Sequence, residues 1–267
     1  MTEHMNMDSA VLLASIIASF GILYNTVELY LGRKEILKDF YNWRLIKSRY
    51  YLFINRPTLS LVFDFLFARK TFLRIVIVHG IAAILFPLVF YFQIQLAAIL
   101  ALIVLLGNGL VNIRLLVGRD GSDQMQNILW AGFFVYCLPL SEMVQWVALW
   151  FIAAQLILSY LTSGYWKLVS KEWRRGVAIH LVTRMATYSP HGISRFFSRP
   201  IFSISFSWLT IIFELFSPLL LFFGVPGATV FIILGTLFHL GIGITMGLTT
   251  FVFAFVATYP IIYTLVQ

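Results

Sequence analysis

This sequence of 267 residues has little charge and almost no cysteine. Asp, Glu, Lys and Arg together make up only 11% of it, whereas 60% is hydrophobic, and the mean hydropathy is +0.90. A water-soluble domain of this length needs a far more polar surface, so the composition excludes one. The single cysteine, Cys137, excludes an intrachain disulfide and a metal cluster held by cysteines.

Two further features are missing. The first ten residues, "MTEHMNMDSA", lack the positive segment of a signal peptide, so we expect the first apolar stretch to be retained. The chain also shows no internal repeat, and the inverted repeat of many transporters is not visible. A transporter is therefore the least favoured of the membrane functions.

Long apolar stretches fill most of the chain. Stretches of about 20 apolar residues are long enough to cross a bilayer as helices. We find roughly eight, and they predict an all-α, polytopic integral membrane helical bundle with about eight transmembrane helices plus an interfacial amphipathic segment. The stretches cover residues 9–31, 72–92, 94–117, 125–140, 142–166, 201–223, 225–243 and 247–266.

The basic residues are concentrated in two segments. Ten of the 19 Lys and Arg residues lie in 33–74 and seven in 167–199, and the other two are Arg114 and Arg119. With eight spans, all of them fall on one side of the membrane, which the positive-inside rule assigns to the cytoplasm. Because the net charge of +8 is spread over loops between apolar stretches, we expect no nucleic-acid partner.

The segment 33–74 is too long for a simple loop. Within it, the sequence "RLIKSRYYLFINRPTLSLVFDFLFARK" alternates basic residues with aromatics and leucines. This pattern predicts one or two amphipathic helices at the lipid surface, interrupted at Pro57. The alternative is a docking surface for a membrane partner or for a secreted peptide or protein.

Among the ionisable residues inside apolar stretches, Glu28, His79, Glu214 and His239 are singled out. Such residues are costly in lipid and are candidates for function. Glu28 lies near a span end and is expected to reach the surface, and His79 is expected to bond a neighbouring helix. Glu214 and His239 lie mid-span, where each needs a partner unless Glu214 is protonated. A catalytic role and a structural hydrogen bond are both open for these two.

Two polar motifs lie at the ends of apolar stretches. In "VGRDGSDQMQNILW", Asp123 can cap the following helix, or it can contact a substrate or ion. In "SGYWKLVSKEWRRGVAIH", Lys167 lies between Trp166 and Trp173. This second motif is either a membrane exit, with a lysine reaching the lipid surface, or the mouth of an active site.

The order of these motifs resembles a known family. "GRDGSD", the span ending "CLPL", "SGYWKLVSKEWRRGVAIH", "FELFSPLLLF" and "LFHLGIGITMGLTTFVFAF" are similar to the horizontally transferred transmembrane (HTTM) domain, the membrane part of vitamin K-dependent γ-carboxylases. The resemblance covers about residues 105–262. It implies an HTTM-like core over 105–267, preceded by N-terminal spans and the basic segment in 1–104, all in one integrated membrane domain.

The resemblance also implies a chemistry. Lys167 matches the family's base, which takes a proton from a reduced, vitamin K-like quinone, and desolvation favours the neutral amine that such a base requires. Trp166 and Trp173 would flank the quinone head, and the turn with Asp123 would contact it. Glu214 and His239 would line the cavity.

The resemblance finally suggests two functions, both in a multi-pass protein of the bacterial cytoplasmic membrane. The first is a quinone-linked enzyme that modifies a peptide or protein and uses no metal. The alternative is a non-catalytic membrane subunit, or a maturation factor for a secreted peptide.

Overall fold

A computed structural model describes residues 6–36, 43–48, 56–115, 120–184 and 191–267. Every regular element in these residues is a helix, which confirms the all-α class. The predicted segments 33–74 and 167–199 lie partly outside the described residues.

Among the described residues, six helical stretches are long and apolar enough to cross a membrane, judged by length and composition. The predicted count of eight is not confirmed. One reason is that α8 (Gly121–Cys137), with 17 residues, is about 25 Å long and falls short of a hydrocarbon layer of about 30 Å. The other is that two predicted spans form one continuous helical stretch, Pro200–Met246. The six are Met7–Leu31, Arg69–Phe92, Ile94–Arg114, Glu142–Val169, Pro200–Met246 and Thr249–Val266.

The chain divides into two compact units. One comprises residues 15–145 and is called the 15–145 unit below. The other comprises residues 1–14 and 146–267 and is called the 146–267 unit.

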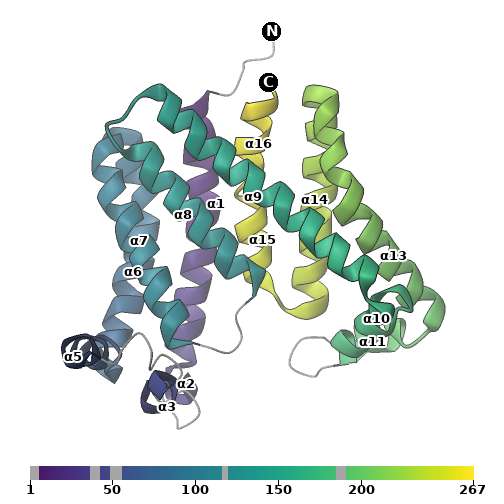
Figure 1. The fold of residues 1–267 in the computed structure, drawn as a ribbon, viewed down its shortest axis with the longest axis horizontal. Coiled ribbons are helices and arrows are strands. Elements are labelled where there is room, and N and C mark those ends of the chain that lie inside the picture. Colours follow the sequence, from purple (N-terminus) through teal and green to yellow (C-terminus); the bar gives the residue numbers. More distant parts are fainter. Residues whose placement is uncertain (1–5, 37–42, 49–55, 116–119, 185–190) are drawn as a thin grey trace. The chain divides into compact units, whose positions relative to one another are not determined.

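The 15–145 unit is built around α6, α7 and α8. The chain reverses at Gln93 between α6 and α7, and α8 packs along α7 (Figure 1). Small alanines let these helices approach closely, and Phe86, Trp130 and Phe133 form an aromatic cluster with ring centroids 5.2–5.8 Å apart. The helices of this unit are α1 (Met7–Leu31, from Ser15 on), α2 (Arg33–Ile36), α3 (Trp43–Lys47), α5 (Pro57–Leu66), α6 (Arg69–Phe92), α7 (Ile94–Arg114) and α8 (Gly121–Cys137).

Two short helices, α3 and α5, pack near the ends of the long helices of this unit. Trp43 of α3 is buried in a hydrophobic cluster with Phe67 and Phe72, and the ring centroids of Trp43 and Phe67 are 4.4 Å apart. Pro57 is the first residue of α5, a position where a fixed φ and a missing N–H are both tolerated.

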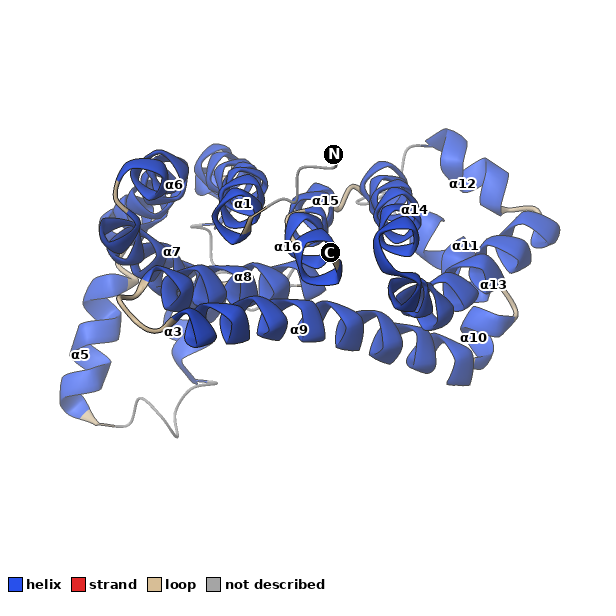
Figure 2. Ribbon diagram, turned by 90° about the horizontal axis from the view of Figure 1, so that it is seen from above, coloured by secondary structure: helices blue, strands red, loops and turns tan. Residues whose placement is uncertain are grey.

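The 146–267 unit contains a helical hairpin. The α13 helix continues into the 3₁₀ helix η3, and the chain then turns at Gly224, whose φ of 66° favours glycine. Figure 1 shows α13 and α14 running in opposite directions on either side of this turn. The short helices α10, α11 and α12 gather beside the start of α13 (Figure 2).

The elements of the 146–267 unit follow one another in the chain with short connections. They are α9 (Glu142–Val169, from Trp146 on), α10 (Lys171–Arg174), α11 (Val177–Arg184), α12 (His191–Phe197), α13 (Pro200–Phe216), η3 (Ser217–Phe223), α14 (Gly224–Met246), α15 (Thr249–Val256) and α16 (Tyr259–Val266).

Candidate functional site

One face of α9 carries the polar residues of the candidate site. Tyr160, Ser163, Gly164 and Lys167 are spaced by three, four and seven residues, so they lie in one stripe along the helix. The stripe meets α13 at Gly164. A Cβ atom at this glycine would lie 2.8 Å from Leu215 Cγ and 3.0 Å from Glu214 Cβ. The absence of a side chain at Gly164 therefore lets α9 and α13 come close.

The close approach brings Lys167 of α9 to Glu214 of α13. The Lys167 Nζ donates to both carboxylate oxygens of Glu214 at 2.7 Å and also to the Ser163 hydroxyl. The Ser163 hydroxyl in turn donates to Glu214 Oε1 at 3.2 Å. Only 16% of the Lys167 side chain and 6% of the Glu214 side chain are exposed. The charge at each end of the pair is thus compensated inside the protein, as burial requires.

Trp173 and Trp166 take different positions around this pair. The Lys167 Nζ lies 5.0 Å from the centre of the Trp173 ring, within the range of a cation–π contact. Trp166 is 64% exposed and its ring stands edge-on to Tyr165. The structure therefore brings Trp173 to the lysine and directs Trp166 to the surface of the unit.

Ser170 fixes the short helix α10 that carries Trp173. Its side-chain oxygen accepts from the Trp173 N–H at 3.3 Å and its hydroxyl donates to Glu172 at 2.8 Å. A backbone hydrogen bond at Glu172 and then this hydroxyl lower the pKa of the Glu172 carboxyl from its ordinary value. The negative charge at the start of α10 is favourable for a helix.

A second buried polar cluster joins α9, α14 and α16. The Tyr160 hydroxyl lies 2.8 Å from His239 Nε2 and 3.0 Å from the Tyr259 hydroxyl, and all three residues are at most 2% exposed. A Cβ atom at Gly235, one turn before His239, would collide with the Tyr259 hydroxyl. The Nδ1 atom of His239 is buried and has no hydrogen-bond partner among the described residues.

Aromatic rings enclose this cluster. The Phe255 ring stacks on His239 with centroids 4.3 Å apart, and the Phe213 and Phe231 rings stand edge-on to Tyr160. Tyr160 lies two turns from Lys167 on the same face of α9, about 10 Å along the helix axis. Lys167, Glu214 and His239, which were predicted from the sequence, are thus gathered around a single stripe.

Asp123 lies in the 15–145 unit and takes part in a capping box. Asp120 is the N-cap residue of α8, and its carboxylate accepts from the Ser122 N–H at 2.8 Å. Asp123 accepts from the Asp120 N–H at 3.2 Å. The structure therefore gives Asp123 a role at the helix start, as the reciprocal partner of the cap.

The remaining ionisable residues lie in the 15–145 unit as well. His79 Nε2 lies 2.8 Å from Asn108 Oδ1, which confirms the predicted bond to a neighbouring helix. Glu28 is exposed near the end of α1. No group of three or more His, Cys, Asp or Glu side chains that could hold a metal ion occurs within the described residues.

Three residues of the site were missed by sequence reasoning. Ser163 and Tyr160 had a signal, since both share the helical spacing of Lys167. Tyr259 had none, because one tyrosine in an apolar stretch is also typical of a lipid-surface position.

The fold and the site define a class: a multi-helix protein with six apolar helices fit to cross a membrane and a lysine–glutamate pair buried between two helices. Comparison with known protein families, with curated proteins and with solved structures finds no match to this chain. The resemblance to the HTTM domain stays a prediction.

Proposed function

We propose that this chain is a multi-pass membrane enzyme that takes a proton from a lipid-soluble hydroquinone at the Lys167–Glu214 pair. The observation that carries the proposal is this buried pair, which lies between helices long and apolar enough to cross a membrane. Ionisable groups at such positions are expensive and mark sites of proton movement or ligand binding. The HTTM resemblance suggests the same lysine for the same step.

The residues around Lys167 fit a planar ring with an acidic hydroxyl. The indole of Trp173 offers a flat face next to the ammonium group, and part of the Lys167 side chain is exposed. A bound hydroquinone would supply a hydroxyl proton and, once deprotonated, an electron-rich ring. Lys167 would meet the hydroxyl and Trp173 would hold the ring.

The pair itself explains how a lysine can act as a base here. The resting pair is an ion pair, and in the proposed first step Glu214 accepts a proton from the Lys167 ammonium along their 2.7 Å hydrogen bond, which gives a neutral amine and a neutral carboxylic acid. Surroundings of low polarity reduce the cost of this neutral form, because its groups carry no charge that needs solvation. The amine then accepts the substrate proton, while Ser163 keeps Nζ in place.

We further propose that the chain crosses the membrane eight times. The hairpin in Pro200–Met246 would supply two crossings and α8 another. Both basic segments then face the cytoplasm of a bacterium. The substrate that is modified with the help of the deprotonated hydroquinone is a peptide or protein. Cysteine labelling from either side of the membrane at the Gly224 turn and at Glu142 tests this topology.

The enzymatic proposal is tested in proteoliposomes with a short-chain naphthohydroquinone. Oxidation of the hydroquinone by dioxygen to quinone and hydrogen peroxide proceeds through its anion, so a base accelerates oxygen consumption. We expect Lys167→Met to lower the protein-dependent rate about 100-fold or more, the range for a general base. An oxygen electrode measures the rate.

The matched control is Lys171→Met, an exposed lysine one turn further along the chain. It should keep the wild-type rate. Equal rates in wild type and in Lys167→Met, with both proteins eluting as one symmetric peak in size-exclusion chromatography, would disprove the proposal.

A further inference from the structure

The short helix α5 presents apolar side chains to the outside of its unit. Leu61, Val62 and Phe65 are 70%, 52% and 67% exposed, and their spacing places them on one helical face. None of the ten residues of α5 is buried. A helix covering a protein surface in water shows its polar side chains on this outer face.

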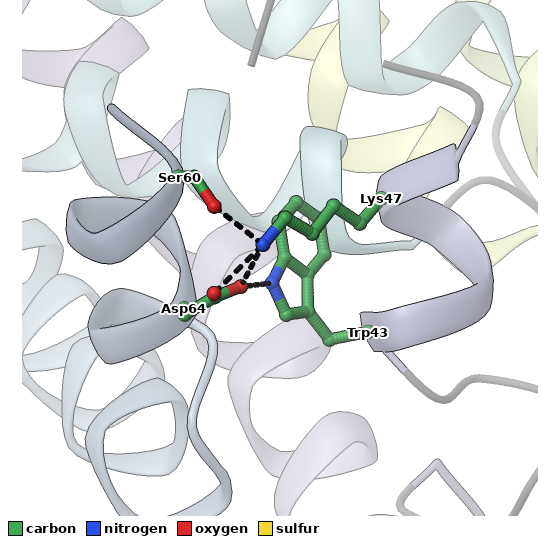
Figure 3. Close-up of polar contacts among 4 residues, drawn as sticks. All are labelled: Trp43, Lys47, Ser60 and Asp64. Atoms are coloured by element: carbon green, nitrogen blue, oxygen red, sulfur yellow. Dashed lines mark hydrogen bonds and ion pairs between the residues drawn. The ribbon is translucent and has the colours of Figure 1, made fainter. Parts of the chain in front are cut away.

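The polar side chains of α5 face the neighbouring helix α3. Figure 3 shows Ser60 and Asp64 directed toward Lys47 and Trp43. The Lys47 Nζ donates to the Ser60 hydroxyl at 2.6 Å and to the Asp64 carboxylate at 2.7 and 2.9 Å. The Trp43 indole N–H donates to Asp64 Oδ1 at 2.6 Å. These polar groups find partners within the protein.

The partial exposure of the polar network between α3 and α5 indicates how deep α5 lies in the bilayer. The side chains of Lys47 and Asp64 are 30% and 44% exposed, so they keep contact with polar surroundings. A helix in the hydrocarbon core would have to bury them fully. An outward apolar face beside a half-exposed ion pair is the arrangement of a helix that lies in the plane of the lipid–water interface.

Exposed basic residues border α5 at both ends. Arg56 is its N-cap residue, and Arg69 and Lys70 begin α6 just after the turn at its C-terminus. The single acidic residue of α5, Asp64, is neutralised by Lys47. The border of the apolar face is therefore positive and complements anionic headgroups.

We propose that α5 is a binding surface for anionic phospholipid. Leu61, Val62 and Phe65 insert among the acyl chains near the headgroups, and Arg56, Arg69 and Lys70 hold the phosphates. The α3–α5 network keeps this face directed toward the lipid. This inference does not depend on the proposed enzymatic activity.

The first experiment measures where the apolar face lies. Leu61→Cys and Glu142→Cys are made in full-length protein with Cys137→Ala, labelled with a fluorophore and reconstituted in phosphatidylcholine–phosphatidylglycerol vesicles. Lipids with a nitroxide near the headgroup should quench the label at residue 61, and aqueous iodide should quench it weakly. The label at residue 142, an exposed helix start, should show the reverse. Iodide quenching of residue 61 equal to that of residue 142 would overturn the proposal.

The second experiment tests the charge. The triple variant Arg56→Gln, Arg69→Gln and Lys70→Gln is compared with Lys171→Gln and Arg174→Gln on α10 combined with Arg175→Gln at its C-cap. Native mass spectrometry counts the phosphatidylglycerol that each purified protein retains. Each charge near an anionic surface strengthens binding about fivefold, so the first variant should lose retained lipid. Equal loss in both variants would show a general charge effect and contradict a site at α5. A protein that co-purifies through α5 in place of lipid would contradict it too.

Discussion

The two units each contain a lysine–carboxylate ion pair, and the pairs differ in burial. Lys167 and Glu214 are 2.7 Å apart with side chains 16% and 6% exposed. Lys47 and Asp64 are also 2.7 Å apart, but their side chains are 30% and 44% exposed. The bond length is the same, so the difference lies in the surroundings. The first pair has lost most of its water, and the second keeps much of it.

Buried contacts between helices differ in charge. The long helices of the 15–145 unit are joined at depth by a neutral contact, His79 to Asn108. In the 146–267 unit the contact of Tyr160 with His239 is also neutral, whereas the contact of Lys167 with Glu214 is charged. A neutral hydrogen bond satisfies two buried groups at little cost, whereas a buried charge pair carries a desolvation penalty that its attraction only partly offsets. A pair retained in spite of this penalty is the better candidate for chemistry.

The largest effect is expected when the buried pair is broken on one side. Lys167→Met leaves the Glu214 carboxylate buried without its cation, where the Ser163 hydroxyl still donates to it. Removing one member of a buried pair costs about 3–5 kcal/mol in free energy of unfolding. The measurement is unfolding by sodium dodecyl sulfate in mixed micelles, followed by circular dichroism.

The double variant Lys167→Met and Glu214→Leu is the control for this prediction. It removes both charges, so most of the lost stability should return. If the single variant costs less than about 1 kcal/mol, the pair behaves like an exposed one, and the contrast between the units disappears.

A smaller effect is expected at the glycine that brings the two helices together. Gly164→Ala places a methyl group against Leu215 and Glu214, and overpacking of this kind costs about 1–3 kcal/mol. Gly109→Ala on α7 is the matched control, because a Cβ atom there meets open space. It should be neutral, or stabilise by up to about 1 kcal/mol through helix propensity. Equal effects at both positions would show that α9 and α13 do not depend on this close approach.

Sequence reasoning recovered the ionisable part of the site. Glu214 and His239 stand out because charge and imidazole are rare in apolar stretches, and Lys167 stands out through its motif. Their partners were not assigned, because Lys167 and Glu214 are 47 residues apart. No local pattern fixes which faces of two distant helices meet. That contact depends on Gly164 and on the angle at which α9 crosses α13.

The span count shows a different limit. Hydropathy places apolar residues on both sides of Gly224 and predicts two spans there. In the structure the helical hydrogen bonding continues through η3, with Pro218 near its start, so the two predicted spans form one stretch of 47 residues. Composition identifies the long apolar helices well, because helices of this length and hydropathy suit an apolar medium. It does not report that helical hydrogen bonding continues from α13 through η3 up to the turn at Gly224.

The smallest effect is expected at the exposed pair. Lys47→Met removes the cation beside Asp64, whose half-exposed carboxylate keeps the Trp43 hydrogen bond and can be solvated by water. An exposed pair contributes about 0–1 kcal/mol, so the free energy of unfolding should fall by less than that. Salt provides the sharper test. Screening by about 1 M salt should remove the difference between wild type and Lys47→Met, since the Debye length is then about 3 Å. The difference between wild type and Lys167→Met should persist under the same conditions, because a buried pair is screened far less. If salt removes both differences equally, burial does not separate the two pairs, and the case for proton chemistry at Lys167 loses its physical basis.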